Sequence, residues 1–272
     1  FVVNSKELKV SAFITPQQWV LAFNSLNKLM PYSPFLQKYQ IDNGNFSIYK
    51  RESEENIKFL AKVDYKHTLL HLGGKNISNY IIKGEIDNSN NTSYMEINDK
   101  VNVNVANDII AIKGSNVGIN LNKTVDLINE ISSTNQKPSK SHISLSFDNS
   151  YIYLSDQRRV IADSMELQYL NEIITAQIKY KDAEAGFKYK KRKFHLYGSG
   201  FNSLFMENLF ALSKFKGGSL DFSIKGDIDE FGGVIYIKDT TIKKFRLLNN
   251  ILAFVNTVPS LVTFSLPSYN TR

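Results

Sequence analysis

The chain of 272 residues contains no cysteine. Disulfide bonds, cysteine-ligated zinc and thiol catalysis are therefore excluded, but the compartment is not fixed, because periplasmic and cytosolic proteins can both lack cysteine. Polar residues interrupt every apolar run well before the ~18 residues that span a bilayer, and no signal peptide is visible. Since the sequence starts at Phe1 without an initiating Met, we expect a piece of a longer protein, with any anchor or targeting signal outside it.

Motifs that carry catalysis are also missing. The Gly-containing segments at 198–200 and 216–219 fit turns better than a phosphate-binding loop, and no serine lies in a Gly-x-Ser-x-Gly elbow. His67 and His71 are four residues apart but lack the Glu of a zinc protease motif, so we interpret them as a surface pair. We therefore predict a protein that is not an enzyme and that holds no metal and no cofactor.

The positive charge of the chain has several possible meanings. The net charge is +7, which suits a nucleic acid, an anionic membrane surface or simple solubility. The basic residues are scattered, and we interpret the one dense run, at 188–193, as a solvated hairpin tip. No nucleic-acid-binding module is recognisable, so we expect no nucleic acid partner.

The dominant pattern is an alternation of apolar and polar residues with a period of two, which is typical of strands with one apolar face. Val101, Val103 and Val105, for example, are separated by Asn102 and Asn104. Short polar turns between such runs, and the 18 Phe and 14 Tyr, favour an antiparallel sheet with one apolar and one solvated face. The same alternation occurs at 8–14, 57–63, 143–147, 174–180, 185–189 and 220–224.

Four segments have the apolar spacing of amphipathic helices. Thr15-Pro16 supplies a cap residue and a proline at the first helical position, which predicts a helix from there to Met30. The other helices are predicted at 123–132, 202–214 and 246–257. The polar, proline-containing stretch 137–141 is a domain boundary or an ordinary loop. We divide the chain into a β-rich segment with an N-terminal helix, 1–136, and a β region with two helices, 137–272.

The C-terminal third carries an ordered set of motifs. A predicted helix at 201–210 leads into a Gly-Gly turn and a strand at 215–226, a strand with the pattern G-x-I-x-I-x-D follows at 231–242, and an apolar segment occupies 248–261. This order resembles the C-terminal region of AsmA-like proteins, and most closely their YhdP-type branch. The resemblance covers about residues 140–272, and its motifs are structural, so it assigns no catalytic residue.

The resemblance implies both a fold and a function. AsmA-like proteins are similar to bridge-like lipid-transfer proteins, which implies a mainly β fold. Its extended, twisted antiparallel sheet would curl into an open trough, with a few amphipathic helices packed at its edges or end. It further implies a periplasmic, Gram-negative cell-envelope protein, anchored to the inner membrane through a segment outside this chain. Such a protein would carry phospholipid acyl chains along an apolar groove between inner and outer membrane and support outer-membrane biogenesis and barrier integrity. Phospholipid is then the expected partner, with envelope proteins as further candidates.

Alternation alone leaves the apolar face as either a closed core or a lipid-facing groove. A groove would favour lipid transfer, because each CH2 group of an acyl chain that is exposed to water costs ~0.8 kcal/mol. Since the lipid must slide along the groove, no single residue should dominate its binding. The helices near Phe205 and Phe254 would pack on the sheet or cap the trough. The alternative function is a non-enzymatic β scaffold or protein-interaction module in cell-envelope assembly. The candidate groove residues are Leu145, Phe147, Ile178, Phe187, Leu220, Phe222, Ile224, Ile235 and Ile237.

Overall fold

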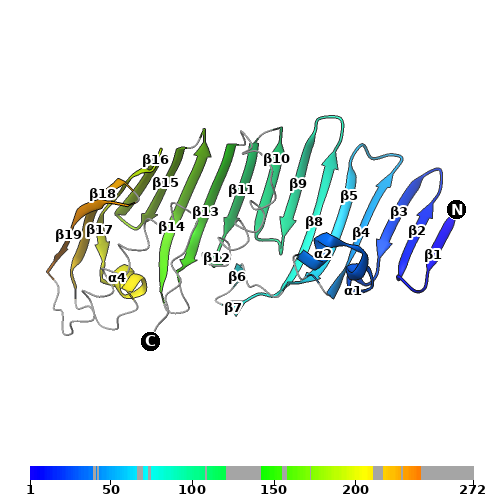
Figure 1. The fold of residues 1–272 in the computed structure, drawn as a ribbon, viewed down its shortest axis with the longest axis horizontal. Helices are drawn as coiled ribbons and strands as arrows, with labels where there is room; N and C mark the ends of the chain where they lie inside the picture. The colour runs from blue at the N-terminus through cyan, green and yellow to red at the C-terminus, as the bar shows by residue number, and fades with distance from the viewer. Residues whose placement is uncertain are drawn as a thin grey trace. The chain divides into compact units, whose positions relative to one another are not determined.

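The computed structural model describes residues 1–38, 41, 43–65, 70–72, 75–107, 109–120, 142–154, 158–171, 173–210, 217–227 and 229–239. These residues are mainly β, with open antiparallel sheet and short helices, which confirms the expected fold class (Figure 1). The helices predicted at 123–132 and 246–257, with Phe254, and also His67 and the loop 137–141, lie outside the described residues.

The chain divides into two compact units. Unit 1 comprises residues 1–68 and 75–114, and unit 2 comprises residues 69–74 and 115–272. The division therefore falls near residue 115, and not at the predicted position between 136 and 137. The short segment 69–74 belongs to unit 2 although unit 1 surrounds it in the sequence, a long-range association that local sequence patterns do not reveal.

The described strands of unit 1 form an antiparallel meander, in which each strand pairs with the next in the order β1, β2, β3, β4, β5, β8, β9, β10, β11. A two-residue strand, β7 (Lys75–Asn76), precedes β8. The bounds of the paired strands are β1 Val2–Ser5, β2 Val10–Ile14, β3 Gln18–Phe23, β4 Asn43–Arg51, β5 Ile57–Asp64, β8 Asn79–Asp87, β9 Thr92–Ile97, β10 Val101–Ala106 and β11 Ile109–Ser115.

The helix predicted from Thr15 to Met30 is wrong for most of its length, because Gln18–Phe23 forms strand β3. Thr15 instead begins a tight turn between β2 and β3. Its backbone N–H donates to the Gln18 carbonyl oxygen (2.8 Å), and its hydroxyl accepts the Gln18 N–H (3.1 Å). Proline suits the second position of such a turn as well as the start of a helix, since both need a φ near −65°. Pro16 is therefore an ambiguous signal.

Among the described residues of unit 1, helical structure is confined to one segment between β3 and β4. It contains α1 (Leu26–Leu29), the 3-10 turn η1 (Met30–Tyr32) and α2 (Pro34–Lys38). Figure 1 shows α1 and α2 across one face of the sheet near β4 and β5. Leu26 and Leu36 are buried, which indicates that the apolar side of this segment faces the sheet.

The described strands of unit 2 pair in the order β6, β12, β13, β14, β15, β16, β17, β18, β19. The β12–β13 pair is parallel and the others are antiparallel. The bounds are β6 Leu70–Leu72, β12 Val117–Asn120, β13 His142–Tyr153, β14 Arg159–Leu170, β15 Ile173–Tyr180, β16 Ala183–Lys190, β17 Lys193–Asn202, β18 Ser219–Asp227 and β19 Phe231–Lys238.

One helix of unit 2, α4 (Ser203–Phe210), follows β17 without a loop. The Asn202 side-chain oxygen accepts the Phe205 N–H at 3.1 Å and so caps the helix. This confirms the start of the helix predicted at 202–214, whose last residues lie outside the described part. The dense basic run is confirmed as a hairpin tip, because Lys191 and Arg192 form the turn between β16 and β17 with positive φ angles of 48° and 69°.

Candidate lipid-binding surface

Cross-strand pairing places all nine candidate groove residues on one face of the unit 2 sheet, because directly opposed residues point to the same side. We call this the unit 2 apolar face, and it consists of parallel rows of side chains. One row runs through Phe147, Met165, Ile178, Ala185, Gly198, Phe222 and Ile235. The next contains Leu145, Leu167, Ala176, Phe187, Leu196, Ile224 and Gly233. Leu220 and Ile237 oppose each other one row further along β18 and β19.

The opposite face of the same strands is polar. The row next to that of Phe147 contains Ser146, Glu166, Gln177, Gly186, Tyr197, Ser223 and Val234. The Lys238 ammonium group donates to Asp221 on this face at 2.8 Å, and that hydrogen bond is the main reason why the pKa of Asp221 is lowered. The sheet of unit 2 is therefore apolar on one side and solvated on the other.

Helix α4 closes part of the unit 2 apolar face. Met206 and Leu209 are 0% and 1% exposed, and they pack in one core with Leu220, Phe222 and other residues of the sheet. The expectation that Leu220 and Phe222 line an open groove is therefore corrected, because both are buried beneath the helix. Of the two roles considered for the helix near Phe205, packing on the sheet is the one observed.

The other candidate residues of unit 2 differ in exposure. Phe147 and Ile224 are buried, the latter in a small cluster with Phe194 and their neighbours. The half-buried candidates are Leu145, Ile178, Phe187, Ile235 and Ile237. The part of the predicted surface that a ligand could reach is therefore smaller than the set of nine residues.

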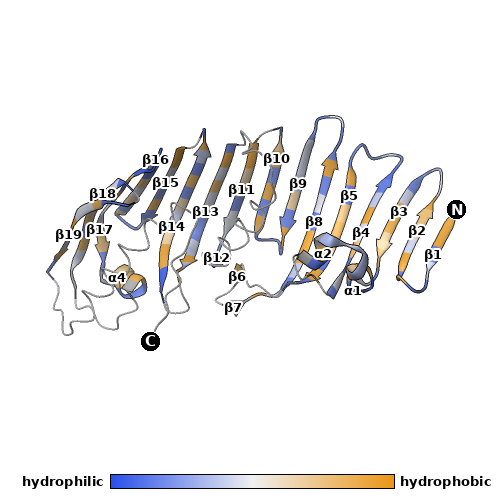
Figure 2. Cartoon of the chain, in the orientation of Figure 1, coloured by the Kyte–Doolittle hydropathy of each residue, from blue (hydrophilic) through white to orange (hydrophobic). Residues whose placement is uncertain are grey.

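Unit 1 carries a second apolar row, most of which the sequence analysis missed. We call it the unit 1 strip. It crosses β1 to β5 and β8 to β11 and contains Val3, Ala12, Leu21, Ile48, Phe59, Gly84, Met95, Val103 and Ile112. None of these residues is buried, and Val3 at the edge is 48% exposed. Figure 2 shows hydrophobic bands recurring along these strands.

A glycine in the unit 1 strip has a steric reason. A Cβ atom at Gly84 would lie 2.6 Å from the Phe59 ring and 2.2 Å from the Tyr94 carbonyl oxygen. Any larger residue would therefore displace the Phe59 ring, which lies across the neighbouring strand. Because Gly84 has no side chain, the Phe59 ring can occupy the space above it, and the apolar surface of the strip continues across this strand.

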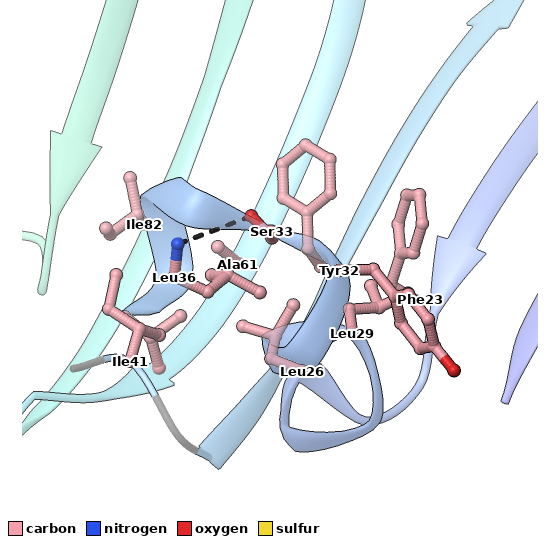
Figure 3. A pocket seen from close by; sticks show the side chains of 11 residues that line it. Phe23, Leu26, Leu29, Tyr32, Ser33, Leu36, Ile41, Ala61 and Ile82 are labelled. Carbon is pink, nitrogen blue, oxygen red and sulfur yellow. Dashed lines mark hydrogen bonds between the residues drawn. The ribbon is translucent and has the colours of Figure 1, made fainter. Parts of the chain in front are cut away.

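An apolar pocket of about 580 Å³ lies beside the unit 1 strip, between the sheet and the helical segment. Figure 3 shows Phe23, Ala61 and Ile82 from the strands facing Leu26 and Leu29 from α1. Its size is within the ~300–1,000 Å³ range of ligand pockets. The remaining lining residues are Tyr32, Ser33, Leu36, Ile41, Phe46 and Val63.

Polar groups contribute little to this pocket. The Ser33 hydroxyl accepts the Leu36 N–H at 3.3 Å, so it is already engaged in starting α2 (Figure 3). Tyr32 is 72% exposed, which places most of its surface in solvent. Among the described residues that line the pocket, none carries a charge. Such a lining suits a hydrocarbon chain better than a polar metabolite.

Charged groups of unit 1 gather on the opposite face of the sheet. The Lys83 ammonium group lies 2.6 Å from an Asp99 oxygen and 3.3 Å from a Glu96 oxygen. The hydrogen bond to Asp99, and then the one to Glu96, raises the pKa of Lys83, while Lys83 lowers the pKa of Asp99. Both units therefore have the same design, with one face for apolar contacts and one for water.

Among the described residues, no group of three or more His, Asp or Glu side chains is placed to hold a metal ion. The described helices include none that is long and apolar enough to span a membrane. His71 stacks on the Tyr153 ring with 4.0 Å between the ring centroids, and it is therefore not the plain surface residue that the sequence suggested.

The fold and its surfaces define a mainly β protein with wide apolar sheet faces. Comparisons with protein-family models, with curated proteins and with solved structures found no match. What the chain binds must therefore be inferred from its own residues.

Proposed function

We propose that this chain is a non-enzymatic lipid-transfer segment that carries phospholipid acyl chains along its apolar sheet faces. The unit 1 strip carries the proposal, because an apolar row crosses a whole sheet without a buried member. Each CH2 group of an acyl chain exposed to water costs about 0.8 kcal/mol, so a continuous, partly exposed apolar row lowers the free energy of the chain along its path. Large contiguous apolar patches on a protein surface mark interaction sites.

The unit 1 pocket supports the same function. It adjoins the strip through Phe23, Phe46, Ala61 and Ile82, which form the neighbouring row of the same face. A chain lying on the strip could therefore insert several methylene groups between the sheet and α1. Its uncharged lining fixes neither a headgroup nor a chain length, which is what a sliding ligand needs.

The resemblance of residues 140–272 to AsmA-like proteins supports a cellular location for this transfer. It favours a periplasmic protein that is anchored to the inner membrane through a segment outside this chain. Phospholipid would move between the inner and outer membranes and so support the outer-membrane barrier. Envelope proteins at either membrane are further candidate partners, and a nucleic acid partner is not expected.

A second candidate function is a β scaffold or protein-interaction module of the cell envelope. The core beneath α4 favours it, because Phe201, Met206 and Leu209 are almost completely buried in side-chain packing. A scaffold would bind protein partners through its surface and would purify without lipid. The two functions therefore differ in what accompanies the purified chain.

The first test is lipid extraction and mass spectrometry of the purified chain, in which we expect phospholipid. The second uses two variants of β5, Phe59→Glu in the unit 1 strip and Leu60→Glu on the opposite face. Loss of the Phe59 contact should remove about 1.5–3 kcal/mol of apolar burial, or about 10- to 100-fold in lipid affinity. Leu60→Glu should retain wild-type affinity.

The matched pair separates a loss of lipid contact from a general effect of a new charge, because both variants add one carboxylate to the same strand. Transfer of a fluorescent phospholipid between vesicles provides the readout, with circular dichroism to show that both variants fold. A wild-type chain free of phospholipid, or equal transfer by the two variants, would overturn the lipid-transfer proposal and favour the scaffold.

A further inference from the structure

A polar pocket of about 640 Å³ lies at one end of the unit 2 apolar face. Ile161 and Tyr180 line this pocket and also belong to the core beneath α4, so the pocket opens on the same side of the sheet as the apolar rows. Its other walls come from β6, β12, β13, β14 and α4. They contain His71, Asn116, Gly118, Asn149, Tyr151, Tyr153, Arg159, Ala162, Asp163, Leu204 and Asn208.

The aromatic wall of this pocket is closely packed. The His71 and Tyr153 rings are nearly parallel, at an angle of 12°. Gly118 is in β12, the strand between those of His71 and Tyr153, and it is paired directly with His71. A Cβ atom at Gly118 would lie 2.5 Å from the Tyr153 ring and 2.9 Å from the His71 Cβ atom. The glycine is therefore needed for the ring stack, and the stack forms a rigid side of the pocket.

Arg159 is the cation of the pocket, and two groups fix its position. Its Nε atom donates to the Asn208 side-chain oxygen at 2.6 Å, and its guanidinium carbon lies 5.1 Å from the centre of the Tyr151 ring. The Asn208 amide is itself oriented, since its Nδ2 atom donates to the Leu204 carbonyl oxygen at 2.8 Å. Asn208 thus links α4 to the arginine and is a positioning residue.

The terminal nitrogens of Arg159 are left for a ligand. Within the described part of the chain, no carboxylate forms an ion pair with Arg159. Asp163 also lines the pocket, but its carboxylate accepts the backbone N–H of Lys181 at 2.6 Å. The Lys181 ammonium group lies 5.6 Å from the centre of the Tyr180 ring, which adds a second positive charge close to the pocket wall.

We propose that this pocket binds the phosphate group of a phospholipid whose acyl chains lie on the unit 2 apolar face, an inference that rests on the proposed lipid-transfer function. A guanidinium suits this task because its parallel N–H groups can bind two phosphate oxygens at once. Nε is occupied by Asn208, so the two terminal nitrogens make the contact. The aromatic and amide walls then surround the polar ester region of the lipid.

The geometry of the strands agrees with the length of one lipid. Tyr153 is opposite Arg159, and Phe147 is opposite Met165 in the apolar row. Phe147 and Tyr153 are six residues apart on strand β13, a span of about 20 Å at about 3.3 Å per residue. One leaflet of a bilayer, with headgroups, is also about 20 Å thick, half of ~40–45 Å. Acyl chains that start from a phosphate at Arg159 therefore have the length to extend along β13 and β14 as far as Phe147 and Met165, whose own side chains are buried.

The test compares two lipids with identical acyl chains, phosphatidylglycerol and diacylglycerol, which differ in the phosphate headgroup. Native mass spectrometry of the full chain would give the affinity for each, for the wild type, Arg159→Gln, Arg159→Lys and Asn208→Ala. We expect Arg159→Gln to weaken phosphatidylglycerol binding at least tenfold and to leave diacylglycerol binding unchanged. Arg159→Lys should restore part of the loss, and Asn208→Ala should weaken phosphatidylglycerol binding to a smaller extent.

Arg192→Gln is the matched control, because it removes the same charge at the hairpin tip between β16 and β17, and it should bind both lipids as the wild type does. Equal binding of phosphatidylglycerol by the wild type and a folded Arg159→Gln would overturn the headgroup site and leave lipid transfer standing. A wild type that binds neither lipid would overturn both proposals.

Inorganic phosphate and glycerol phosphate form the last arm of the experiment. If they bind through Arg159 as tightly as phosphatidylglycerol does, the site recognises a free phosphate and the lipid assignment is wrong. If they bind at least tenfold more weakly, the acyl chains contribute to the affinity and the lipid headgroup is supported as the source of the phosphate.

Discussion

Leu21 and Leu209 allow the open and closed apolar surfaces of this chain to be compared by the same substitution. Leu209 is 1% exposed in the core beneath α4, whereas Leu21 is half-buried in the unit 1 strip. Leu→Ala removes three methylene equivalents, a loss of about 2.4 kcal/mol when the side chain is fully buried. At Leu209 the enclosed cavity adds to this, so the free energy of unfolding should fall by about 3–4 kcal/mol.

At Leu21 the expected loss is only about 1.5–2 kcal/mol, because part of the side chain already contacts solvent and no enclosed cavity forms. Trp19, the single tryptophan of the sequence, lies in the same strand and reports the unfolding of unit 1 by fluorescence. Far-UV circular dichroism follows the strands of both units. Urea titration of each variant against the wild type then gives the two changes separately.

Added phospholipid extends the comparison. At a free lipid concentration 100 times its Kd, a ligand that binds only the folded state adds about 2.7 kcal/mol to the free energy of unfolding. Leu21→Ala should reduce this gain, whereas Leu60→Ala, on the opposite face of the same sheet in strand β5, should not. A loss of about 3 kcal/mol at Leu21 without lipid would refute the reasoning, since it would mean that the strip is a closed core in solution.

Two further predictions concern stability. Gly198→Ala should lower the free energy of unfolding by about 1–3 kcal/mol, because the new Cβ atom would lie 2.6 Å from the Phe222 ring and 2.8 Å from the Phe201 ring. Gly232 has open space around it, so Gly232→Ala should change the free energy of unfolding by less than about 0.5 kcal/mol. Equal urea midpoints for the two would contradict the packing described at Gly198. Hydrogen bonds from Ser89 and Asn90 lower the pKa of Asp87 to about 2, below the value of about 3.9 in the unfolded chain. The stabilising contribution of the Asp87 carboxylate is therefore complete above pH ~4 and is lost as the pH falls towards 2. Asp87→Ala should therefore weaken the acid dependence of unit 1 unfolding, followed by Trp19 fluorescence, and an unchanged acid transition would exclude this role for Asp87.

Much of the sheet could be predicted from the sequence, because a period-two alternation is a direct consequence of one solvated face. The sets at 174–180 and 185–189 form β15 and β16, which are joined by a short polar turn at Lys181-Asp182. The same alternation placed the nine candidate residues on one face. Pairing register then follows, since a shift by one residue would turn every apolar side chain of a strand into water.

Strand β3 could not be predicted in this way, because it has no alternation. All six residues of Gln18–Phe23 are half-buried, and the apolar Val20 and Ala22 lie on the face opposite Leu21 and Phe23. Such an unbroken apolar run fits a helix and a strand equally well, and Pro16 allows both. The missed strand is one reason why the unit 1 strip was not recognised, since Leu21 is one of its members.

The distinction between core and groove depends on the width of the helical cover, which strand patterns do not contain. Rows on one face of a strand are two residues apart, or about 6.6 Å, and a helix with its side chains is about 10–12 Å wide, so one helix covers about two rows. In unit 1 the pocket beneath the helical segment is lined by the rows of Val63 and of Phe46, while the row of Ile48 and Phe59 is not part of its lining.

Unit 2 follows the same geometry. Helix α4 packs on the rows of Leu220 and Phe222, and the rows of Leu145 and Ile143 lie further along the strands, outside that core. In the described part of each unit the apolar face is therefore wider than its helix. A protein that needed only a closed core would gain nothing from this extra width, and polar residues at the uncovered positions would make it more soluble. The excess of apolar rows over helical cover is consequently the feature that an acyl chain would occupy, and it is present in both units.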